Sequence, residues 1–92
     1  MKLRLTRPAA RQLDEVLAYI DQHDPQGGRK VQARIATVLH LLLRHPFAGH
    51  TTSRPGIRRI VVSPYPYALT YRIGDGEIVV RSLRHTSRRP QA

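Results

Sequence analysis

The stretch that decides the fold runs from residue 57 to residue 85. In order, it consists of IRRIVV (57–62), a break SPYP (63–66), YALTYRI (67–73), a turn GDG (74–76) and EIVVRSLRH (77–85). The runs on the two sides of the turn are rich in β-branched and aromatic residues, and glycine adopts the positive φ that a short reversing loop requires. These patterns predict a β-hairpin, to which residues 57–62 most simply add a third antiparallel strand.

Successive side chains of the first hairpin strand point to opposite faces of the sheet. One face carries Tyr67, Leu69, Tyr71 and Ile73, and the other carries Ala68, Thr70 and Arg72. The first set is apolar or aromatic, so we expect it to pack against a covering layer. The preceding part of the chain must supply that cover.

Residues 8–23 predict an amphipathic helix. Thr6 stands at the position of its N-cap, and Pro8 falls in the first turn, where the missing N–H costs nothing. Residues 2–6 alternate in polarity and predict a short strand that joins the C-terminal sheet. The apolar residues of the helix recur at i, i+3, i+4 and i+7, namely Leu13, Val16, Leu17 and Ile20.

A second helix is predicted from Pro25 to about Arg44. Asp24 stands at its N-cap, where a carboxylate interacts favourably with the helix dipole. The two glycines at 27–28 weaken its first turn by about 1 kcal/mol each, and Pro46 ends it. Its apolar stripe consists of Val31, Ile35, Val38, Leu39 and Leu42.

The expected order of elements is strand, helix, helix, strand, strand, strand. It predicts one α+β domain over residues 1–92 (β-α-α-β-β-β), with a helical hairpin packed on one face of a mainly antiparallel sheet. Residues 47–56 are rich in glycine, proline and hydroxyl side chains and are predicted to form a loop. Residues 86–92 have no periodicity, so we expect a flexible basic tail.

The charge balance points to an anionic partner. The chain has 16 lysines and arginines against 6 aspartates and glutamates, which gives a formal net charge of +10 at pH 7. A small domain with this surplus attracts nucleic acid or an acidic protein. All but two of the basic residues are arginines, whose planar forks bind phosphate and carboxylate in a bidentate way. A GC-rich genome is an alternative source of the arginine preference.

Several classes of protein are excluded or disfavoured. Cysteine is absent, which excludes disulfides and thiolate metal sites. Residues 1–5 lack the apolar core of a signal peptide, and the apolar segment 38–43 is too short to cross a bilayer. We therefore expect a cytoplasmic protein with no membrane association. His40, His45 and His50 straddle a predicted helix end and a loop, so we expect no metal site and no cofactor.

A resemblance to a known family is carried by five segments and their order. They are DP (24–25), HP (45–46), GIRR (56–59), YALTYRI (67–73) and SLRH (82–85). Over nearly the whole chain, they resemble the RelE/ParE superfamily of toxins from bacterial type II toxin–antitoxin modules. The resemblance implies a cognate acidic antitoxin that lays a helix over the helical hairpin and a strand along the sheet edge.

The superfamily contains two activities: RelE-like members are ribosome-dependent mRNA endonucleases, and ParE-like members poison DNA gyrase. RelE-like enzymes commonly carry an arginine where this chain has Ala68, and a tyrosine just past the last strand, where this chain has HTS (85–87). They often carry lysine or glutamate in the loop 47–56, where the one charge here is Arg54. These departures favour a gyrase inhibitor. A RelE-like nuclease acting on ribosome-bound mRNA and a non-toxic nucleic-acid-binding domain are the alternatives.

Cleavage of RNA without a metal requires a base, a cation for the transition state and an acid. For the nuclease alternative, the resemblance leaves Arg59, Arg81 and His85, with His85 as the acid–base. Arg81 and His85 are four residues apart, so we expect them on one face of the last strand. The favoured interpretation has no catalytic residue. It assigns contacts with the target or the antitoxin to Arg58, Arg72, Arg84, Arg88 and Arg89.

Overall fold

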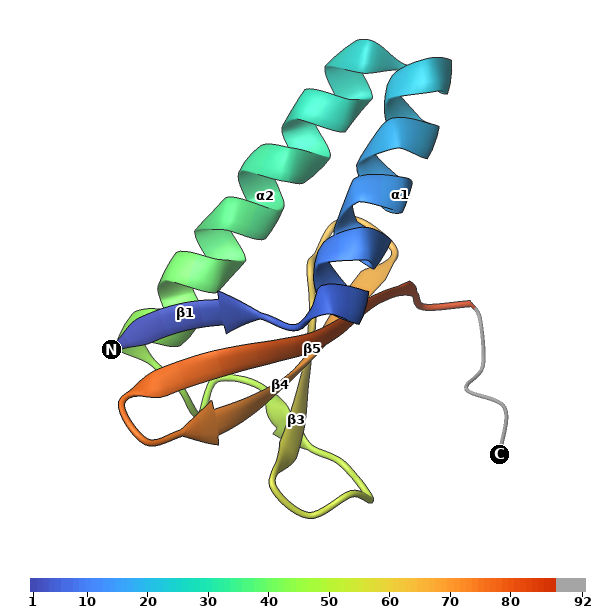
Figure 1. The fold of residues 1–92 in the computed structure, drawn as a ribbon. Coiled ribbons are helices and arrows are strands. Elements are labelled where there is room, and N and C mark those ends of the chain that lie inside the picture. Colours follow the sequence, from blue (N-terminus) through green and yellow to red (C-terminus); the bar gives the residue numbers. More distant parts are fainter. Residues whose placement is uncertain (88–92) are drawn as a thin grey trace.

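A computed structural model describes residues 1–87 of the chain. In chain order, its elements are β1 (Lys2–Leu5), α1 (Arg7–His23), α2 (Pro25–Arg44), β2 (His50–Thr51), β3 (Ile57–Val61), β4 (Tyr67–Gly74) and β5 (Glu77–His85). The strands form one sheet in the order β1-β5-β4-β3-β2. The two helices form a hairpin over one face of that sheet (Figure 1). The expected α+β architecture is therefore confirmed.

The sheet is antiparallel except at one edge, where β1 runs parallel to β5 and pairs Lys2 with Glu77 and Leu5 with Val80. The turn between β4 and β5 is shorter than expected, because Gly74 pairs with Glu77. Gly76 has a φ of +67°, the left-handed conformation that glycine adopts without a steric penalty.

One strand was not predicted. His50 and Thr51 form β2, which pairs with Arg59 and Arg58 of β3 at the far edge of the sheet. The strand has two residues and lies in a polar, glycine-containing segment, so neither an alternating pattern nor β propensity marks it. The prediction of an uninterrupted loop over residues 47–56 is wrong at these positions.

The start of α1 has the predicted cap. Thr6 accepts a hydrogen bond at its Oγ1 from the N–H of Ala9 at 3.2 Å, and a proline occupies the first turn. Thr6 also ties the helix to the sheet, because its N–H donates to the carbonyl of Val80 at 3.0 Å and its hydroxyl donates to the carbonyl of Arg81 at 3.4 Å. One residue therefore joins the end of β1 and the start of α1 to the middle of β5.

The start of α2 differs from the prediction in one respect. Asp24 occupies the N-cap position, but its side chain makes no capping hydrogen bond. The carboxylate lies over Gly27 instead, where an added Cβ would be 2.5 Å from Oδ2. Gly28 is buried against α1, and a Cβ there would be 3.6 Å from the backbone of Asp21. Gly27 thus makes room for the Asp24 carboxylate, and Gly28 packs on α1 at ordinary van der Waals distance.

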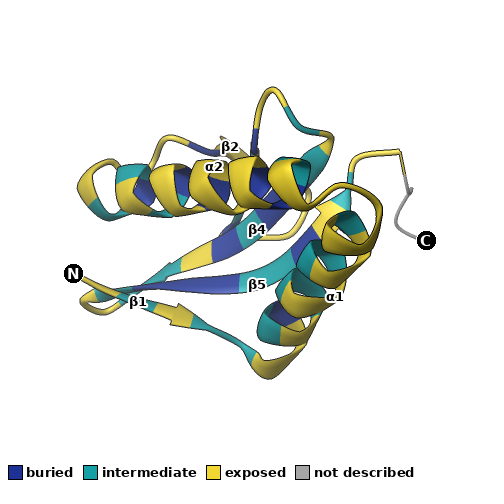
Figure 2. Ribbon diagram, turned by 90° about the horizontal axis from the view of Figure 1, so that it is seen from above, coloured by how far each residue is buried: buried dark blue, intermediate teal, exposed yellow. Residues whose placement is uncertain are grey.

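The core lies between α2 and the centre of the sheet (Figure 2). Tyr71 and Leu42 are both fully buried, at 0% exposure. The predicted stripe of α2 is confirmed at its buried positions, whereas the stripe of α1 is half-buried and packs on the margin of the core. The apolar face predicted for β4 is the face that the helices cover. The residues that form this core are Ala9, Val31, Ile35, Val38, Leu42, Val62, Leu69, Tyr71, Ile78, Val80 and Leu83.

A β-bulge interrupts the pairing of β4 with β5. Thr70 pairs with Ser82 and Tyr71 pairs with Val80, which leaves Arg81 as the extra residue. An extra residue shifts the alternation of side chains by one position. Val79 therefore lies opposite Arg72 on the uncovered face, whereas His85 lies opposite Tyr67 on the face of the helices. Arg81 is the extra residue of the bulge and has no partner in β4, so its placement on one face with His85 stays a prediction.

Candidate functional site

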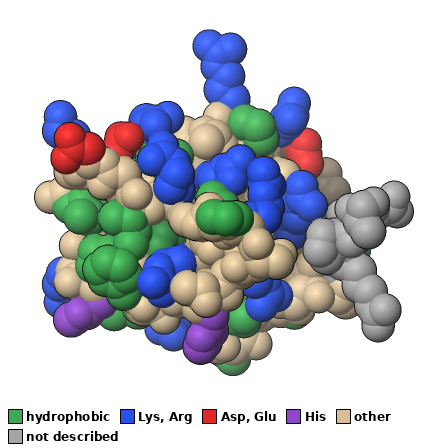
Figure 3. Space-filling view, turned by 90° about the horizontal axis from the view of Figure 1, so that it is seen from below, with side chains coloured by type: hydrophobic (Ala, Val, Ile, Leu, Met, Phe, Trp, Pro, Cys, Tyr) green, Lys and Arg blue, Asp and Glu red, His purple; other side chains and the backbone are tan. Residues whose placement is uncertain are grey.

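The uncovered face of the sheet, called here the open face, carries three of the sequence-predicted site residues. By strand pairing, Arg59 lies opposite Thr70, and Arg84 lies opposite Ala68, with Arg72 two residues further along β4. The side chains of Arg59, Arg72 and Arg84 are exposed. Figure 3 views this side of the molecule and shows a band of basic side chains across it.

One ion pair lies at the β1 edge of the open face. Arg4 Nε is 3.2 Å from Glu77 Oε1, and its Nη2 donates to Oε2 at 3.3 Å. The hydrogen bond from Arg4 is the main reason that the pKa of Glu77 lies below its ordinary value, and the charges of Arg4, Arg72 and Lys2 add to it. Partial burial acts in the opposite direction.

Ala68 forms part of the floor of the open face. Its side chain is 6% exposed and lies between Val61 of β3 and Arg84 of β5. Thr70 and Ser82, the next pair on this face, are joined through their hydroxyl groups. The centre of the face is therefore a floor of small side chains with arginines around it.

Two of the residues considered for RNA cleavage, Arg59 and His85, lie far apart. Arg59 and His85 are separated by two strand spacings and by three residues along the strands, which corresponds to roughly 14 Å between their backbones. They also lie on opposite faces of the sheet. Arg81 occupies the bulge between them. A base and a cation must both reach one phosphate, and this arrangement does not bring them together.

The ring of His85 is held by its neighbours. The N–H of Ser87 donates to His85 Nδ1 at 3.1 Å, and the hydroxyl of Ser87 lies 2.7 Å from the same nitrogen. Tyr67 contacts the ring edge-to-face, with the centroids 5.4 Å apart. The N–H of Thr86 donates to the carbonyl of Pro66 at 2.8 Å. The first two residues of the expected tail are thus hydrogen-bonded, and Arg88 and Arg89 lie outside the described residues.

Arg58 has a structural role that the sequence did not indicate. Its Nη1 donates to the carbonyl of Gly49 at 2.8 Å and approaches that of Phe47 at 3.5 Å. Its guanidinium also lies 4.8 Å from the centroid of the Phe47 ring. The side chain that was expected to contact a partner is therefore occupied by the segment that follows α2.

Tyr71 holds the same segment from inside the core. Its hydroxyl donates to the carbonyl of Pro46 at 2.6 Å and accepts from the N–H of Gly49 at 2.9 Å. A Cβ at residue 49 would be 2.7 Å from Tyr71 Oη and 2.9 Å from the carbonyl of Arg59, so only glycine fits. The sequence placed Tyr71 in the core, but its hydroxyl partners are far apart in the chain and could not be inferred.

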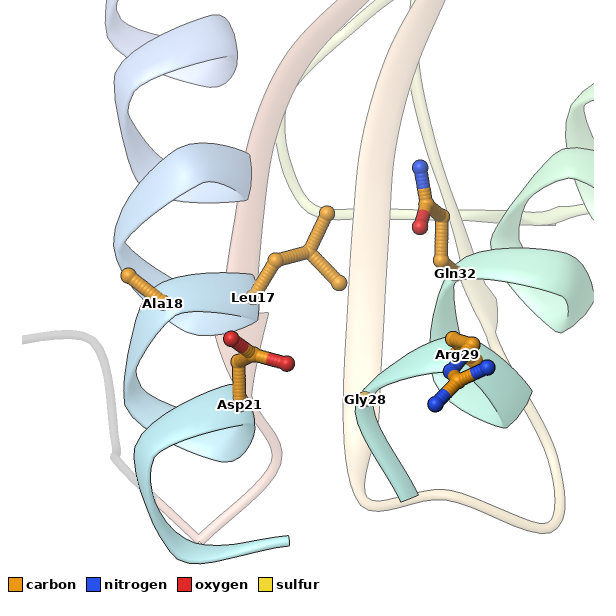
Figure 4. Close-up of a pocket in the computed structure, with 6 residues that line it drawn as sticks. All are labelled: Leu17, Ala18, Asp21, Gly28, Arg29 and Gln32. Atoms are coloured by element: carbon orange, nitrogen blue, oxygen red, sulfur yellow. The ribbon is translucent and has the colours of Figure 1, made fainter. Parts of the chain in front are cut away.

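The end of the helical hairpin contains an open pocket of about 260 Å³. Figure 4 shows side chains from both helices around it. An acid from α1 and a base from α2 contribute to a mixed apolar and polar lining, which is suited to a side chain of a partner protein. The lining residues are Leu17, Ala18, Asp21, Gly28, Arg29 and Gln32.

Residues 1–87 contain no group of three histidine, aspartate or glutamate side chains placed to hold a metal ion. Neither of the helices in that range has the length and apolarity needed to span a membrane.

Known proteins resemble this chain in both sequence and fold. The chain is 38% identical over 79 residues to the putative toxin Y4kP of Sinorhizobium fredii, a match that covers 85% of this chain and 82% of the relative. It is 29% identical over 76 residues to toxin RelE2 of Caulobacter vibrioides, covering 83% of this chain and 84% of that toxin.

Two solved structures have the same fold. A chain of the chromosomal ParDE toxin–antitoxin system from P. aeruginosa superimposes with a TM-score of 0.81 at 23% identity, over 95% of this chain and 97% of that one. The isolated E. coli RelE toxin superimposes with a TM-score of 0.72 at 18% identity, over 96% of this chain and 86% of that one. Residues 3–90 match the family model described as the ParE toxin of the type II toxin–antitoxin system parDE. With its fold and its sequence in agreement, this chain belongs to the ParE toxin family of type II toxin–antitoxin systems.

Proposed function

We propose that this toxin acts by binding DNA gyrase and trapping the enzyme on DNA, without cutting RNA itself. One observation carries the proposal: His85 and Arg59 lie on opposite faces of the sheet. An acid–base and a phosphate-binding cation in such positions cannot act on one ribose–phosphate link. The match to the ParE toxin family supports the same target.

Ala68 gives further support to a binding mechanism. It lies at the centre of the open face, beside Arg84, and its methyl group supplies neither charge nor a hydrogen-bond donor. The hydroxyls of Thr70 and Ser82 satisfy each other. The face can therefore attract and hold an anionic surface, and among residues 1–87 we assign no group on it to protonate a leaving oxygen.

Membership of the family implies a cognate antitoxin as the first partner. We propose that this antitoxin is acidic, because a toxin with a net charge of +10 attracts an acidic protein over long range and binds it faster at low salt. An antitoxin helix lying along α1 and α2 would place side chains in the pocket lined by Leu17 and Gly28.

The direct test is a gyrase supercoiling assay with the purified toxin and with the His85→Ala variant. Both are expected to inhibit supercoiling to the same extent, and prior addition of the antitoxin is expected to restore activity. Inhibition by neither protein would contradict the proposal.

A ribosome-dependent mRNA endonuclease is the second candidate, favoured by the likeness to the relative named toxin RelE2. The two candidates are separated by incubating the toxin with translating ribosomes and mapping the 5′ ends of the mRNA. Toxin-dependent cleavage that His85→Ala abolishes would replace the gyrase proposal with this one.

A further inference from the structure

The acidic residues are segregated from the middle of the sheet. Of the six in the chain, Asp14, Glu15, Asp21 and Asp24 belong to the helical hairpin or its connection. Asp75 and Glu77 lie at the turn between β4 and β5, and Glu77 is paired with Arg4. No carboxylate therefore lies among the strand positions at the centre of the open face.

Three arginines of the open face differ from Arg4 and Arg58, which also belong to strands of the sheet. Arg4 is paired with Glu77, and Arg58 donates to the carbonyl of Gly49 at 2.8 Å. In contrast, Arg59, Arg72 and Arg84 make no hydrogen bond or ion pair with residues 1–87. Their guanidinium groups keep all their donors available to a ligand.

These three arginines come from three neighbouring strands. Arg59 is on β3, Arg72 on β4 and Arg84 on β5, and their register positions differ by two to four residues. On a β lattice, this places their backbones roughly 8 to 14 Å apart. The floor between them consists of small side chains, so an extended ligand can approach all three at once.

We propose that the open face binds the phosphate backbone of duplex DNA through Arg59, Arg72 and Arg84. Guanidinium forks bind phosphate in a bidentate way. The inference goes beyond gyrase binding, because contact between this face and DNA requires no other protein.

The chemistry of the face favours DNA over an acidic protein. Protein–protein contacts depend on buried aromatic or aliphatic anchors, whereas the apolar open-face residues Ile57, Ala68 and Val79 are at most 9% exposed. Val61, at 38%, is the most accessible apolar side chain of the described open face. Interfaces with DNA are more polar and more positively charged, as this face is.

The same residues favour a duplex over a single strand. Proteins that hold single strands stack the bases on aromatic side chains. The aromatic residues of the described strands, Tyr67 and Tyr71, point toward the helices. The open-face strand positions also carry no asparagine or glutamine, side chains that read adenine in the major groove. We therefore expect binding that follows the backbone with little dependence on base sequence.

The test compares two triple variants of the full chain that lose the same charge from different faces. One is Arg59→Gln/Arg72→Gln/Arg84→Gln. The control is Arg11→Gln/Arg29→Gln/Lys30→Gln, all exposed positions of the helices. Affinity for a fluorescent DNA duplex is measured by anisotropy over a range of salt concentrations. The C-terminal arginines are common to all variants, so differences between variants report on the two faces.

The open-face variant is expected to bind more weakly at every salt concentration. The slope of log K against log[salt] should fall in magnitude by about 3, because each phosphate contact contributes about 0.9. The control should change the slope by less than about 1. An unchanged slope in the open-face variant, or an equal loss in the control, would overturn the proposal.

Three companion measurements sharpen the test. The Arg59→Lys/Arg72→Lys/Arg84→Lys variant keeps the charge and should keep the salt slope, so it remains informative if the glutamine variant does not fold. In a competition assay, unlabelled duplex should displace the fluorescent duplex better than polyglutamate or a single strand of the same sequence does. Better displacement by either of these competitors would contradict the proposal. Because these assays contain no gyrase, a toxin that binds DNA but leaves supercoiling unaffected would refute the gyrase target alone.

Discussion

Neighbouring residues of β4 occupy two different environments. Leu69 and Tyr71 point toward the helices and are at most 2% exposed, whereas Thr70 and Arg72 point toward solvent on the open face. The helix side is apolar and tightly constrained, and the open side is basic and contains few internal contacts. The fold therefore depends mainly on one set of alternate residues. The other set contributes little to the core and is exposed for contacts outside the chain.

The largest difference in stability between substitutions on the two faces is expected for two adjacent residues of β4. Leu69→Ala removes a buried side chain from the core and should lower the free energy of unfolding by about 2–5 kcal/mol. Thr70→Ala removes the hydroxyl contact with Ser82 and should cost about 1 kcal/mol. Urea denaturation of the two variants checks this, and equal losses would contradict the assignment of faces.

The next largest loss of stability is expected from a substitution on the helix side of the sheet. Tyr71→Phe leaves the N–H of Gly49 and the carbonyl of Pro46 without their buried partner, which should cost about 1–3 kcal/mol. Tyr67→Phe is the matched control, because the Tyr67 hydroxyl makes no hydrogen bond with residues 1–87. Thermal unfolding should show a clear loss for the first variant and little change for the second.

A smaller effect is expected where the helix layer joins the sheet. Thr6→Ala removes the cap of α1 and the hydrogen bond to the bulge carbonyl, and should cost about 1 kcal/mol. Thr37 is an exposed threonine within α2 whose hydroxyl bonds to the carbonyl of Ala33 in the preceding turn. Thr37→Ala should not destabilise the protein. A comparison of the two denaturation midpoints tests the cap, and coinciding midpoints would argue against it.

The smallest effect is expected from the ion pair on the open face. The pKa of Glu77 is lowered in the folded protein, so the pair stabilises the fold above the ordinary pKa of the carboxyl. This contribution disappears as the pH falls through the lowered folded-state pKa. The stability difference between the parent chain and Glu77→Gln should therefore be present near neutral pH and diminish in acid. In an Arg4→Gln background, the same substitution should show a weaker dependence on pH.

Local chemistry was sufficient to predict most of the fold. Each of three local patterns specified one element through short-range geometry. Thr6 and Pro8 mark the start of α1, the apolar stripe marks α2, and the glycines of residues 74–76 mark the turn between β4 and β5. The alternation in β4 also identified the buried face correctly. The family followed from the order of these elements, because the order is more specific than any single motif.

Long-range contacts account for what the sequence did not reveal. Strand β2 depends on Arg59 as a pairing partner and on the segment that Tyr71 and Arg58 hold in place. The inward role of Arg58 depends on two carbonyl groups about ten residues earlier in the chain. The bulge at Arg81 is set by the pairing with β4, and no local signal marks it. For this reason the relative positions of Arg59 and His85 could not be judged from their spacing.

The extra residue in β5 has an evolutionary consequence. Val80 and Ser82 already lie opposite Tyr71 and Thr70, so a one-codon deletion at position 81 would restore regular pairing and leave both registers unchanged. Leu83 and His85 would stay on the side of the helices, because their partners in β4 would be the same. In such a lineage, β5 could lose one residue without exchanging its two faces, and the histidine would remain separated from the arginines.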